Sequence, residues 1–407
     1  MGNISYFCIV KQIKGSFNIV FVSLLLMFSL KSSATESVEP GMDSVTVSLL
    51  TCGPGSEVWS LYGHTAIRID DRRSGQDMVV NYGLFSFRQK YFIFRFVFGL
   101  TDYSMGITSM DNFIEEYSYE GRTVVQQDLN LSNKEKESFL RALYENALPQ
   151  NVSYRYNFFY DNCTTRARDI LINSIDGMVE YSDTKCVDVS YRSMTHQWNE
   201  PYPWSRWGND ILLGVKADFD TDRRQQQFLP DSLRKDFDNA WIVDKSGSKR
   251  KLVANKFILI SCPQTITADK QTDFCRPAYL FGSLFIITLL TSVVELRKKK
   301  IFWWFDLLLL LATGTAGLIL LAMVFSQHPT VNVNFQIFVF NPLSLFLLYP
   351  VIRKEYRSGA HWYWKLLALC VLAFFVCGFA QQYAEGMYFV ALSLLVRCAV
   401  NVRRVKL

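Results

Sequence analysis

Apolar residues are distributed so unevenly that they divide the 407-residue chain into two parts. Up to about residue 276, the mixture of apolar and polar residues is that of a soluble globular protein. From Pro277 onward, long apolar runs are separated by short basic clusters. A membrane-spanning helix needs about 20 apolar residues. The shorter runs reach this length only if the residues on either side are included. Together the runs predict an all-α transmembrane bundle of about five helices over residues 277–407. The runs lie at roughly residues 278–294, 302–325, 335–351, 366–380 and 387–400.

Basic residues predict how these helices are oriented. The connections after the first and third runs and the C-terminal tail are basic, whereas the loops 326–334 and 381–386 contain no Lys or Arg. Because Lys and Arg are enriched on the cytoplasmic side of membrane proteins, we expect the basic ends in the cytoplasm and the two loops outside. The chain is therefore predicted to be a multi-pass membrane protein with its N-terminal domain on the exported side.

The first 34 residues have the layout of a secretory signal peptide. Lys11 and Lys14 precede the short apolar core FNIVFVSLLLMFSL, and the small residues Ser32 and Ala34 suit a cleavage site. An uncleaved membrane anchor is the alternative interpretation. In either case residues 35–276 are exported and form the predicted periplasmic domain.

Alternating and helical patterns within residues 35–276 predict an α+β domain. Strand patterns cover SVTVSLLTC, GHTAIRIDD and DMVVNYGLF, and the polar turn RRSGQ joins the last two. Residues 132–148 begin with the capping box Ser132–Glu135 and continue with helical spacing. The aromatic run YRYNFFY is strand-like and leads into the helical segment TTRARDILINSI. The later segment KSGSKRK (245–251) is interpreted as a basic loop.

Charge and cysteine usage narrow the class of function. The net charge is +6, but no basic stripe with interleaved aromatic residues appears, which argues against nucleic-acid binding. Five of the nine cysteines lie in the exported part, and an odd number in an oxidising compartment leaves at least one free thiol. We expect Cys262 and Cys275 to be bridged and Cys163 to be free.

The stretch FFYDNCTTRARDIL places Cys163 where a strand-like run becomes a helix. Free backbone N–H groups and the positive end of the helix dipole favour a thiolate over a thiol at such a position. Asp161 or Asn162 can cap this helix, and Arg166 and Arg168 add positive charge within about one turn. The alternative is a buried structural cysteine, since a catalytic role also requires a base.

Two histidines in the exported part could supply that base. His64 opens a predicted strand, from which its ring can project toward a helix, whereas His196 lies in an aromatic segment interpreted as a loop. A cysteine at a helix start facing a histidine on a strand is the constellation of papain-like nucleophiles, and here the histidine comes first, in the permuted order. Asn81, on the strand expected to pair with that of His64, is the candidate to orient the imidazole. Because side chains alternate, only one of Asn81 and Tyr82 can face the site; a surface position for both is the alternative.

The segment SQHPTVNVNFQIFVFNPL gathers polar residues at a membrane boundary. Polar groups there are costly unless they are satisfied or used, and Asn341-Pro342 would break a helix. We interpret the segment either as a capped, kinked helix end or as the membrane-side wall of an active site. The polar residues are His328, Asn332, Asn334 and Asn341.

With Cys163 and His64 identified, the chain resembles a known family. The stretches LLTCGPGSEVWSLYGHTAIRI, VVNYGLFSF, FFYDNCTTRARDIL, FLPDSL and QHPTVNVNFQIFVFNPL resemble, in order, motifs of the Lnb family, bacterial membrane proteins associated with lipoprotein N-acylation. The match covers roughly residues 44–342, and GHTAIRI together with DNCTTR is its fairly specific part. YGH stands where many members have Phe-Gly-His. More distantly, the order of histidine and cysteine is similar to the permuted NlpC/P60 and lecithin–retinol acyltransferase group.

The resemblance implies a permuted papain-like (NlpC/P60-like) periplasmic domain and a membrane-bound thiol acyltransferase. Cys163 would accept a fatty acyl chain from a glycerolipid as a thioester, with His64 as general base. The chain would then pass to the α-amino group of the N-terminal cysteine of a diacylglyceryl lipoprotein. The donor, either the lipoprotein's own sn-2 ester or a phospholipid, stays open, and no cofactor or metal is implied. The residues assigned to substrate binding are Arg166, Tyr62, His328 and Asn334.

Two other functions are compatible with the sequence. One is a membrane-anchored NlpC/P60-like cysteine peptidase or amidase acting on cell-wall peptides, and the other is a non-enzymatic binding or assembly module. The acyltransferase is favoured because both of its substrates are anchored in a bilayer, so a catalyst fixed at the same interface gains from proximity. The aromatic clusters FWWF and HWYW fit interfacial anchoring.

Overall fold

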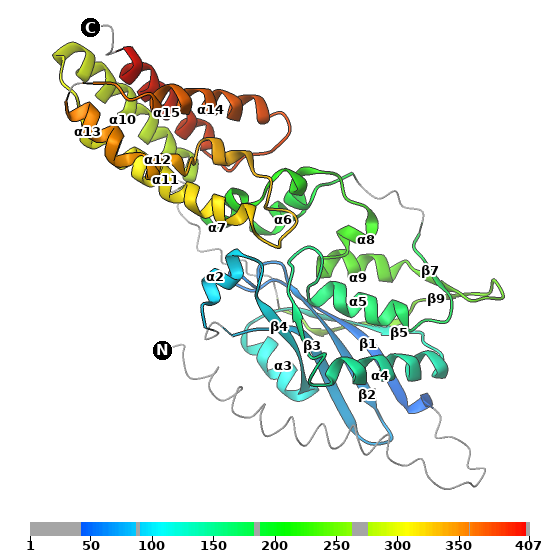
Figure 1. The fold of residues 1–407 in the computed structure, drawn as a ribbon. Coiled ribbons are helices and arrows are strands. Elements are labelled where there is room, and N and C mark those ends of the chain that lie inside the picture. Colours follow the sequence, from blue (N-terminus) through cyan, green and yellow to red (C-terminus); the bar gives the residue numbers. More distant parts are fainter. Residues whose placement is uncertain (1–41, 87–89, 183–187, 263–275, 358, 404–407) are drawn as a thin grey trace.

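The computed structural model describes residues 42–86, 90–182, 188–262, 276–357 and 359–403. The predicted signal peptide lies outside the described residues, and so does Cys275, so the bridge expected between Cys262 and Cys275 stays a prediction. Figure 1 shows a sheet-containing part next to a bundle of longer helices. This mixed α/β domain, followed by a helical region with apolar helices, confirms the predicted fold class.

A seven-stranded antiparallel sheet organises the first part, in the order β10-β5-β1-β2-β3-β4-β6. Three of its strands, β1, β2 and β3, confirm the predicted ones. The aromatic run before Cys163 contributes only the short β6 and then a turn. The strands are β1 (Val45–Cys52), β2 (His64–Asp71), β3 (Gln76–Leu84), β4 (Asp102–Ser109), β5 (Val124–Leu129), β6 (Ser153–Arg155) and β10 (Val253–Ile260).

Helices cover both faces of this sheet, because the strands alternate apolar side chains between the faces. Leu49 of β1 packs in the core that includes Phe139 and Leu171, whereas the next residue, Leu50, packs against Phe113 on the other face. The first face is covered by α4 (Asn133–Ala147), α5 (Cys163–Asn173) and α9 (Pro230–Asp238), and the second by α3 (Met110–Tyr119). The predicted capping box at Ser132 is present at the start of α4.

The segment after α5 folds into short elements that the sequence does not predict in detail. His196, expected in a loop, lies in a helix, and Lys249–Lys251, expected in a basic loop, form an edge strand of a three-stranded sheet. The expectation for His196 is wrong, and the loop is confirmed only for the turn before Lys249, because these elements are short and on average polar. The elements outside the main sheet and its covering helices are η1 (Met42–Ser44), α2 (Phe92–Val97), β7 (Met178–Glu180), α6 (Tyr191–Asn199), α7 (Pro203–Leu212), η2 (Val215–Asp218), α8 (Arg223–Gln226), β8 (Trp241–Val243) and β9 (Lys249–Lys251).

The helical part contains α10 (Pro277–Lys298), α11 (Trp303–Val324), η4 (Phe335–Phe338), α12 (Leu343–Phe346), α13 (Leu348–Tyr356), α14 (Tyr363–Cys377) and α15 (Met387–Arg403). In the described ranges, α10 and α11 are long and apolar enough to cross a membrane. A third span is possible if the pair Phe335–Phe346 and Leu348–Tyr356, bent by 72°, counts as one. As predicted, the chain breaks at Asn341-Pro342. The remaining apolar helices are shorter, so the topology of about five spans stays a prediction.

One buried ionic cluster lies inside the helical bundle. The guanidinium of Arg397 in α15 donates to both carboxylate oxygens of Asp306 in α11, at 2.6 and 2.7 Å, and also to Glu295 in α10. Asn401 donates to Asp306 at 3.0 Å. Because the Arg397 side chain is fully buried, these contacts fix α10, α11 and α15 to one another.

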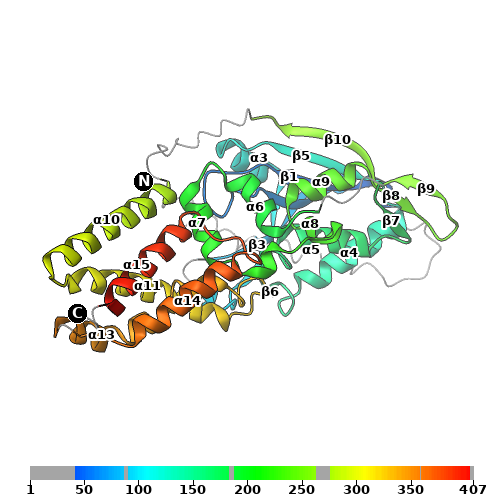
Figure 2. The same cartoon turned by 90° about the horizontal axis from the view of Figure 1, so that it is seen from above.

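Buried amides join the two parts of the molecule. The side chain of Asn334 donates to the carbonyl of Ile211 at 2.7 Å, and that of Gln336 to the carbonyl of Asp210 at 2.8 Å, both at the end of α7. Gln381 donates to Asn334 at 2.9 Å. We refer to Asn334, Gln336 and Gln381 as the interdomain polar cluster. Figure 2 shows α7 at the junction between the sheet-containing part and the long helices.

Candidate active site

Cys163 occupies the first position of α5, and a side-chain cap fixes that position. Asn162 accepts hydrogen bonds from the backbone N–H groups of Thr164 and Thr165, each at 2.9 Å. The hydroxyls of Thr164 and Thr65 lie 3.0 Å apart and tie the helix start to β2. The backbone N–H of a residue at the first helical position has no carbonyl acceptor within its own helix. It is therefore available at the site.

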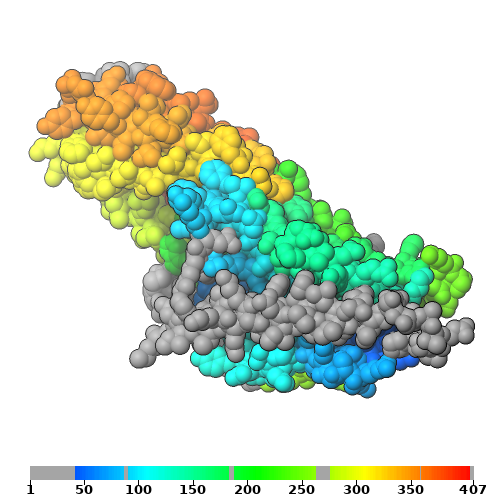
Figure 3. Space-filling view, turned by 60° about the horizontal axis from the view of Figure 1, so that its bottom comes forward, coloured from blue at the N-terminus to red at the C-terminus, as the bar shows by residue number. Residues whose placement is uncertain are grey.

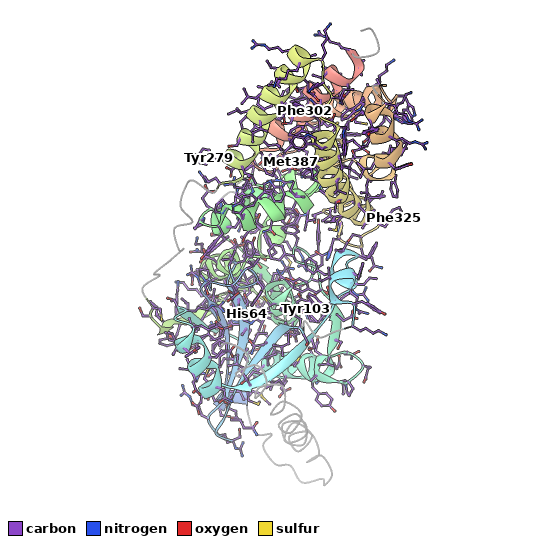
Figure 4. The ribbon with its side chains drawn as sticks, turned by 90° about the vertical axis from the view of Figure 1, so that its left-hand side faces the viewer. His64, Tyr103, Tyr279, Phe302, Phe325 and Met387 are labelled. Atoms are coloured by element: carbon purple, nitrogen blue, oxygen red, sulfur yellow. The ribbon has the colours of Figure 1, made fainter. Side chains whose placement is uncertain are left out.

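His64 is the first residue of β2 and faces the sulfur. The preceding Gly63 has φ +82°, and a Cβ there would lie 2.6 Å from the carbonyl oxygen of Cys52, so the tight approach to His64 requires glycine. The imidazole is hydrogen-bonded to the thiol of Cys163. Figure 4 shows His64 at the end of the sheet nearer the membrane helices. The structure thus brings together the two side chains that the sequence analysis paired.

Asn81 lies on the far side of the imidazole from the sulfur. His64 Nε2 and Asn81 Oδ1 are 3.0 Å apart. Since an amide oxygen only accepts, Nε2 carries a proton and Nδ1 is left to face the thiol. Tyr82, the neighbour of Asn81, instead points into the buried core, as the alternation of a strand requires.

The environment favours a thiolate at Cys163. Burial raises the pKa of this thiol, but the charge of His64 and hydrogen bonds from His64, the backbone of Thr65 and Thr164 outweigh it and lower the pKa to about 7. Burial lowers the pKa of His64. The negative charge of Cys163 and the hydrogen bonds with Cys163 and Asn81 outweigh this effect, so the pKa of His64 lies above its ordinary value. Cys52 is the contrast, because burial raises its pKa to about 12. Both shifts favour a thiolate–imidazolium pair at Cys163 and His64.

The two arginines near Cys163 do not supply the positive charge expected of them. Arg166 binds Asp161 with two hydrogen bonds of 2.6 and 2.8 Å and stacks on the ring of Tyr154, 3.5 Å from its centroid. Arg168 binds the neighbouring Asp169. Because each guanidinium is neutralised by a carboxylate, the imidazole is the main cation beside the sulfur, and Arg166 borders the site as half of an ion pair.

The other three residues assigned to substrate binding each have partners other than the catalytic pair. Tyr62 is buried, and its hydroxyl accepts hydrogen bonds from the side-chain amides of two asparagines in α6 and α7. His328 Nδ1 lies 3.3 Å from the amide nitrogen of Asn157, in the turn that leads to Cys163. Asn334 belongs to the interdomain polar cluster. Within the described ranges, none of the three forms a hydrogen bond with Cys163.

Tyr154 is a site residue that the sequence analysis missed. A Cβ added at Gly83 would lie 3.8 Å from the Cβ of Cys163 and 3.9 Å from the hydroxyl of Tyr154, so the hydroxyl and the cysteine border the same space. The hydroxyl is buried and has no hydrogen-bond partner among the described residues. Burial and then the negative charge of Cys163 raise its pKa, which keeps the donor proton in place. Only its position in an aromatic strand-like run hinted at this role.

No group of three or more His, Cys, Asp or Glu side chains able to hold a metal ion occurs in the ranges that the structure describes. The site geometry is that of a nucleophile, a base and an orienting amide. Backbone and phenol donors lie close to the nucleophile. This arrangement supports chemistry through a covalent thioester.

Comparisons with known proteins give the same picture for both parts of the chain. Residues 33–197 match the family model described as the Lnb N-terminal periplasmic domain, and residues 269–406 match that of the Lnb transmembrane domain. No curated protein and no solved structure matches. The two matches confirm the resemblance seen in the sequence and together cover most of the chain. The chain therefore belongs to the Lnb family, as a membrane protein with a periplasmic domain.

Proposed function

We propose that this protein is a thiol acyltransferase that N-acylates the N-terminal cysteine of bacterial lipoproteins through a thioester on Cys163. The observation that carries the proposal is the contiguous array of Cys163, His64 and Asn81 at the end of the sheet nearer the transmembrane domain. Membership in the Lnb family supports a role in the lipoprotein pathway.

In the first step, the thiolate of Cys163 attacks the carbonyl carbon of a glycerolipid ester. A C–S bond forms, and the negative charge that develops on the carbonyl oxygen is stabilised by the backbone N–H of Cys163 and the hydroxyl of Tyr154. The ester C–O bond then breaks, and the departing oxygen takes a proton from the imidazolium of His64. The products are an acyl thioester and a lipid with a free hydroxyl.

In the second step, the α-amino group of the lipoprotein attacks the thioester carbon. His64, now neutral, accepts a proton from the amine while Asn81 holds the ring in place. Cleavage of the C–S bond restores the thiolate and leaves the acyl chain in an amide bond. Water would hydrolyse the thioester, so the site must exclude it during this step.

The proposed partners are a diacylglyceryl lipoprotein as acceptor and a glycerolipid as donor, both held in the same leaflet. The donor is either the sn-2 ester of the lipoprotein itself or a phospholipid. His328 and Asn334 contribute by joining the transmembrane domain to the segments that carry the site. The proposed location is the inner membrane, with the catalytic domain in the periplasm.

The test is the N-terminal structure of lipoproteins in cells that depend on this protein. Cys163→Ala and His64→Ala should each abolish N-acylation, measured by mass spectrometry of lipoprotein N-terminal peptides. Cys52→Ala is the matched control, because its thiol is buried and inert. Unchanged acylation in the Cys163 variant would rule the proposal out. Release of soluble products from muropeptides without lipid would identify a peptidase instead.

A further inference from the structure

The short helix α2 exposes a cluster of large apolar side chains. Tyr91, Ile93 and Phe94 expose 66%, 74% and 68% of their surface, and Phe96 exposes 41%. Contiguous exposed apolar residues on a folded domain mark a binding surface. Their function depends on what lies beside them.

α2 lies at the level where the membrane helix α11 ends. The backbone N–H of Gln327 donates to the carbonyl of Phe98, just after α2, at 3.0 Å. Gln327 is three residues beyond Val324, the last residue of α11, and α2 itself is only about 9 Å long. Phe325, at the end of α11, is 72% exposed. Figure 3 shows the surface of α2 against that of the membrane helices, and Figure 4 shows α2 beside Phe325.

The composition of α2 matches this depth. Aromatic and basic residues are enriched where a protein meets lipid headgroups, since aromatic rings tolerate the boundary and cations meet phosphates. Lys90 is exposed and lies 5.0 Å from the ring centroid of Tyr91. Arg95, on the same helix, is held by Asp102 at 2.6 Å. Among the described residues 90–97, this surface is thus apolar, with the exposed cation of Lys90 at its start.

An aromatic stack leads from α2 toward the catalytic sulfur. Phe92 of α2 stacks on Phe85 at 6.1 Å between centroids, Phe85 on Tyr103 at 4.8 Å, and Tyr103 on Tyr156 at 4.0 Å. Tyr156 and Cys163 both pack against the hydrophobic core that includes Tyr103, so the stack ends in the same core as the cysteine. Apolar side chains therefore connect the exposed helix with the site.

We propose that α2 inserts its exposed apolar side chains into the outer leaflet of the membrane, and that its partner is the phospholipid of that leaflet. This contact does not depend on the proposed reaction. Where that reaction holds, α2 and the aromatic stack form the path by which an acyl chain leaves the bilayer and reaches Cys163.

The experiment places a photo-crosslinking residue in the full-length protein. p-Benzoylphenylalanine replaces Phe94, and in a matched variant it replaces Phe257, which is 48% exposed on the edge strand β10. Both proteins are reconstituted in vesicles of phosphatidylethanolamine and phosphatidylglycerol and irradiated. Mass spectrometry should find about tenfold or more lipid adduct at position 94 than at position 257, because only position 94 would lie within the lipid. Equal yields, or adducts mainly with protein, would overturn the proposal.

A second measurement tests the path to the site. The double variant Ile93→Ser and Phe94→Ser should lower acyl transfer from membrane lipid about tenfold or more, while alkylation of Cys163 by iodoacetamide stays at the wild-type rate. Unchanged transfer would refute the path. If the wild-type protein transfers no acyl chain at all, the proposed function fails, whereas the crosslinking result still decides whether α2 contacts lipid.

Discussion

Removing the side-chain amide of Asn81 should lower the population of the Cys163 thiolate, although Asn81 contacts His64 and not the sulfur. In the resting site, Nε2 of His64 donates to Asn81 Oδ1 at 3.0 Å. Asn81→Ala removes this acceptor, so the imidazole loses both the contact that fixes its orientation and a partner for its positive charge. We expect the reactive pair of Cys163 and His64 to become less populated.

The size of the effect follows from the charge of the donor. A hydrogen bond from a charged group contributes about 1.5–3 kcal/mol. One factor of ten in a population corresponds to about 1.4 kcal/mol, so the thiolate–imidazolium pair should become about ten- to a hundredfold less populated. Because His64 is what offsets the burial of Cys163, the thiol pKa should climb from about 7 toward its ordinary value of 9.0. The rate at neutral pH should fall accordingly.

The assay is the rate of iodoacetamide alkylation of Cys163 as a function of pH, read by mass spectrometry of its peptide. The wild-type rate should rise with pH through a midpoint near 7, since the thiolate is the nucleophile. In Asn81→Ala the midpoint should move to higher pH, and acyl transfer at pH 7 should fall in parallel. Tyr82→Phe is the control, because the adjacent side chain points into the core. An Asn81→Ala profile that coincides with that of the wild type would refute the orienting role.

Two further variants test features that support the site. Gly63→Ala should lower the thermal unfolding midpoint in detergent by the equivalent of about 1–3 kcal/mol, because a Cβ at φ +82° would lie 2.6 Å from the carbonyl oxygen of Cys52; an unchanged midpoint would contradict this. Arg397→Met should cost about 3–5 kcal/mol by leaving Asp306 buried and unpaired, which would reduce the yield of folded protein in detergent. Arg403→Met, at the exposed end of the same helix, should leave the yield unchanged, and equal losses in both variants would contradict the reasoning.

The parts of the site that could be predicted from sequence are those fixed by local geometry. A cap before Cys163 defines where α5 begins, and a glycine before His64 defines where β2 begins. Strand alternation then leaves Asn81, and not Tyr82, free to reach the imidazole. The first two constraints act within a few residues along the chain, and the third acts between the paired strands β2 and β3.

The features that could not be predicted depend on which side chains and strands the fold brings into contact. Arg166 is close to Cys163 in sequence, but its guanidinium is paired with the carboxylate of Asp161. Its expected stabilisation of the thiolate was therefore too large. The hydroxyl of Tyr154 borders the sulfur because β6 is the last strand of the sheet beside β4, and no local pattern encodes that pairing. Similarly, His196 bonds to the carboxylate of Asp210 from a short, on average polar helix that the sequence analysis interpreted as a loop.

The interdomain polar cluster has a consequence for how the periplasmic domain can be studied and used. A fragment ending before Pro277 would lose the amides of Asn334 and Gln336, and the carbonyls at the end of α7 would lose these donors. The distance of the sulfur from the lipid surface would also no longer be set by the protein. If the proposed reaction holds, the whole chain keeps the sulfur at one height above the bilayer, so that only reactive groups at that height can reach it. An amine on the same residue as its own lipid anchor has a height fixed in the same way.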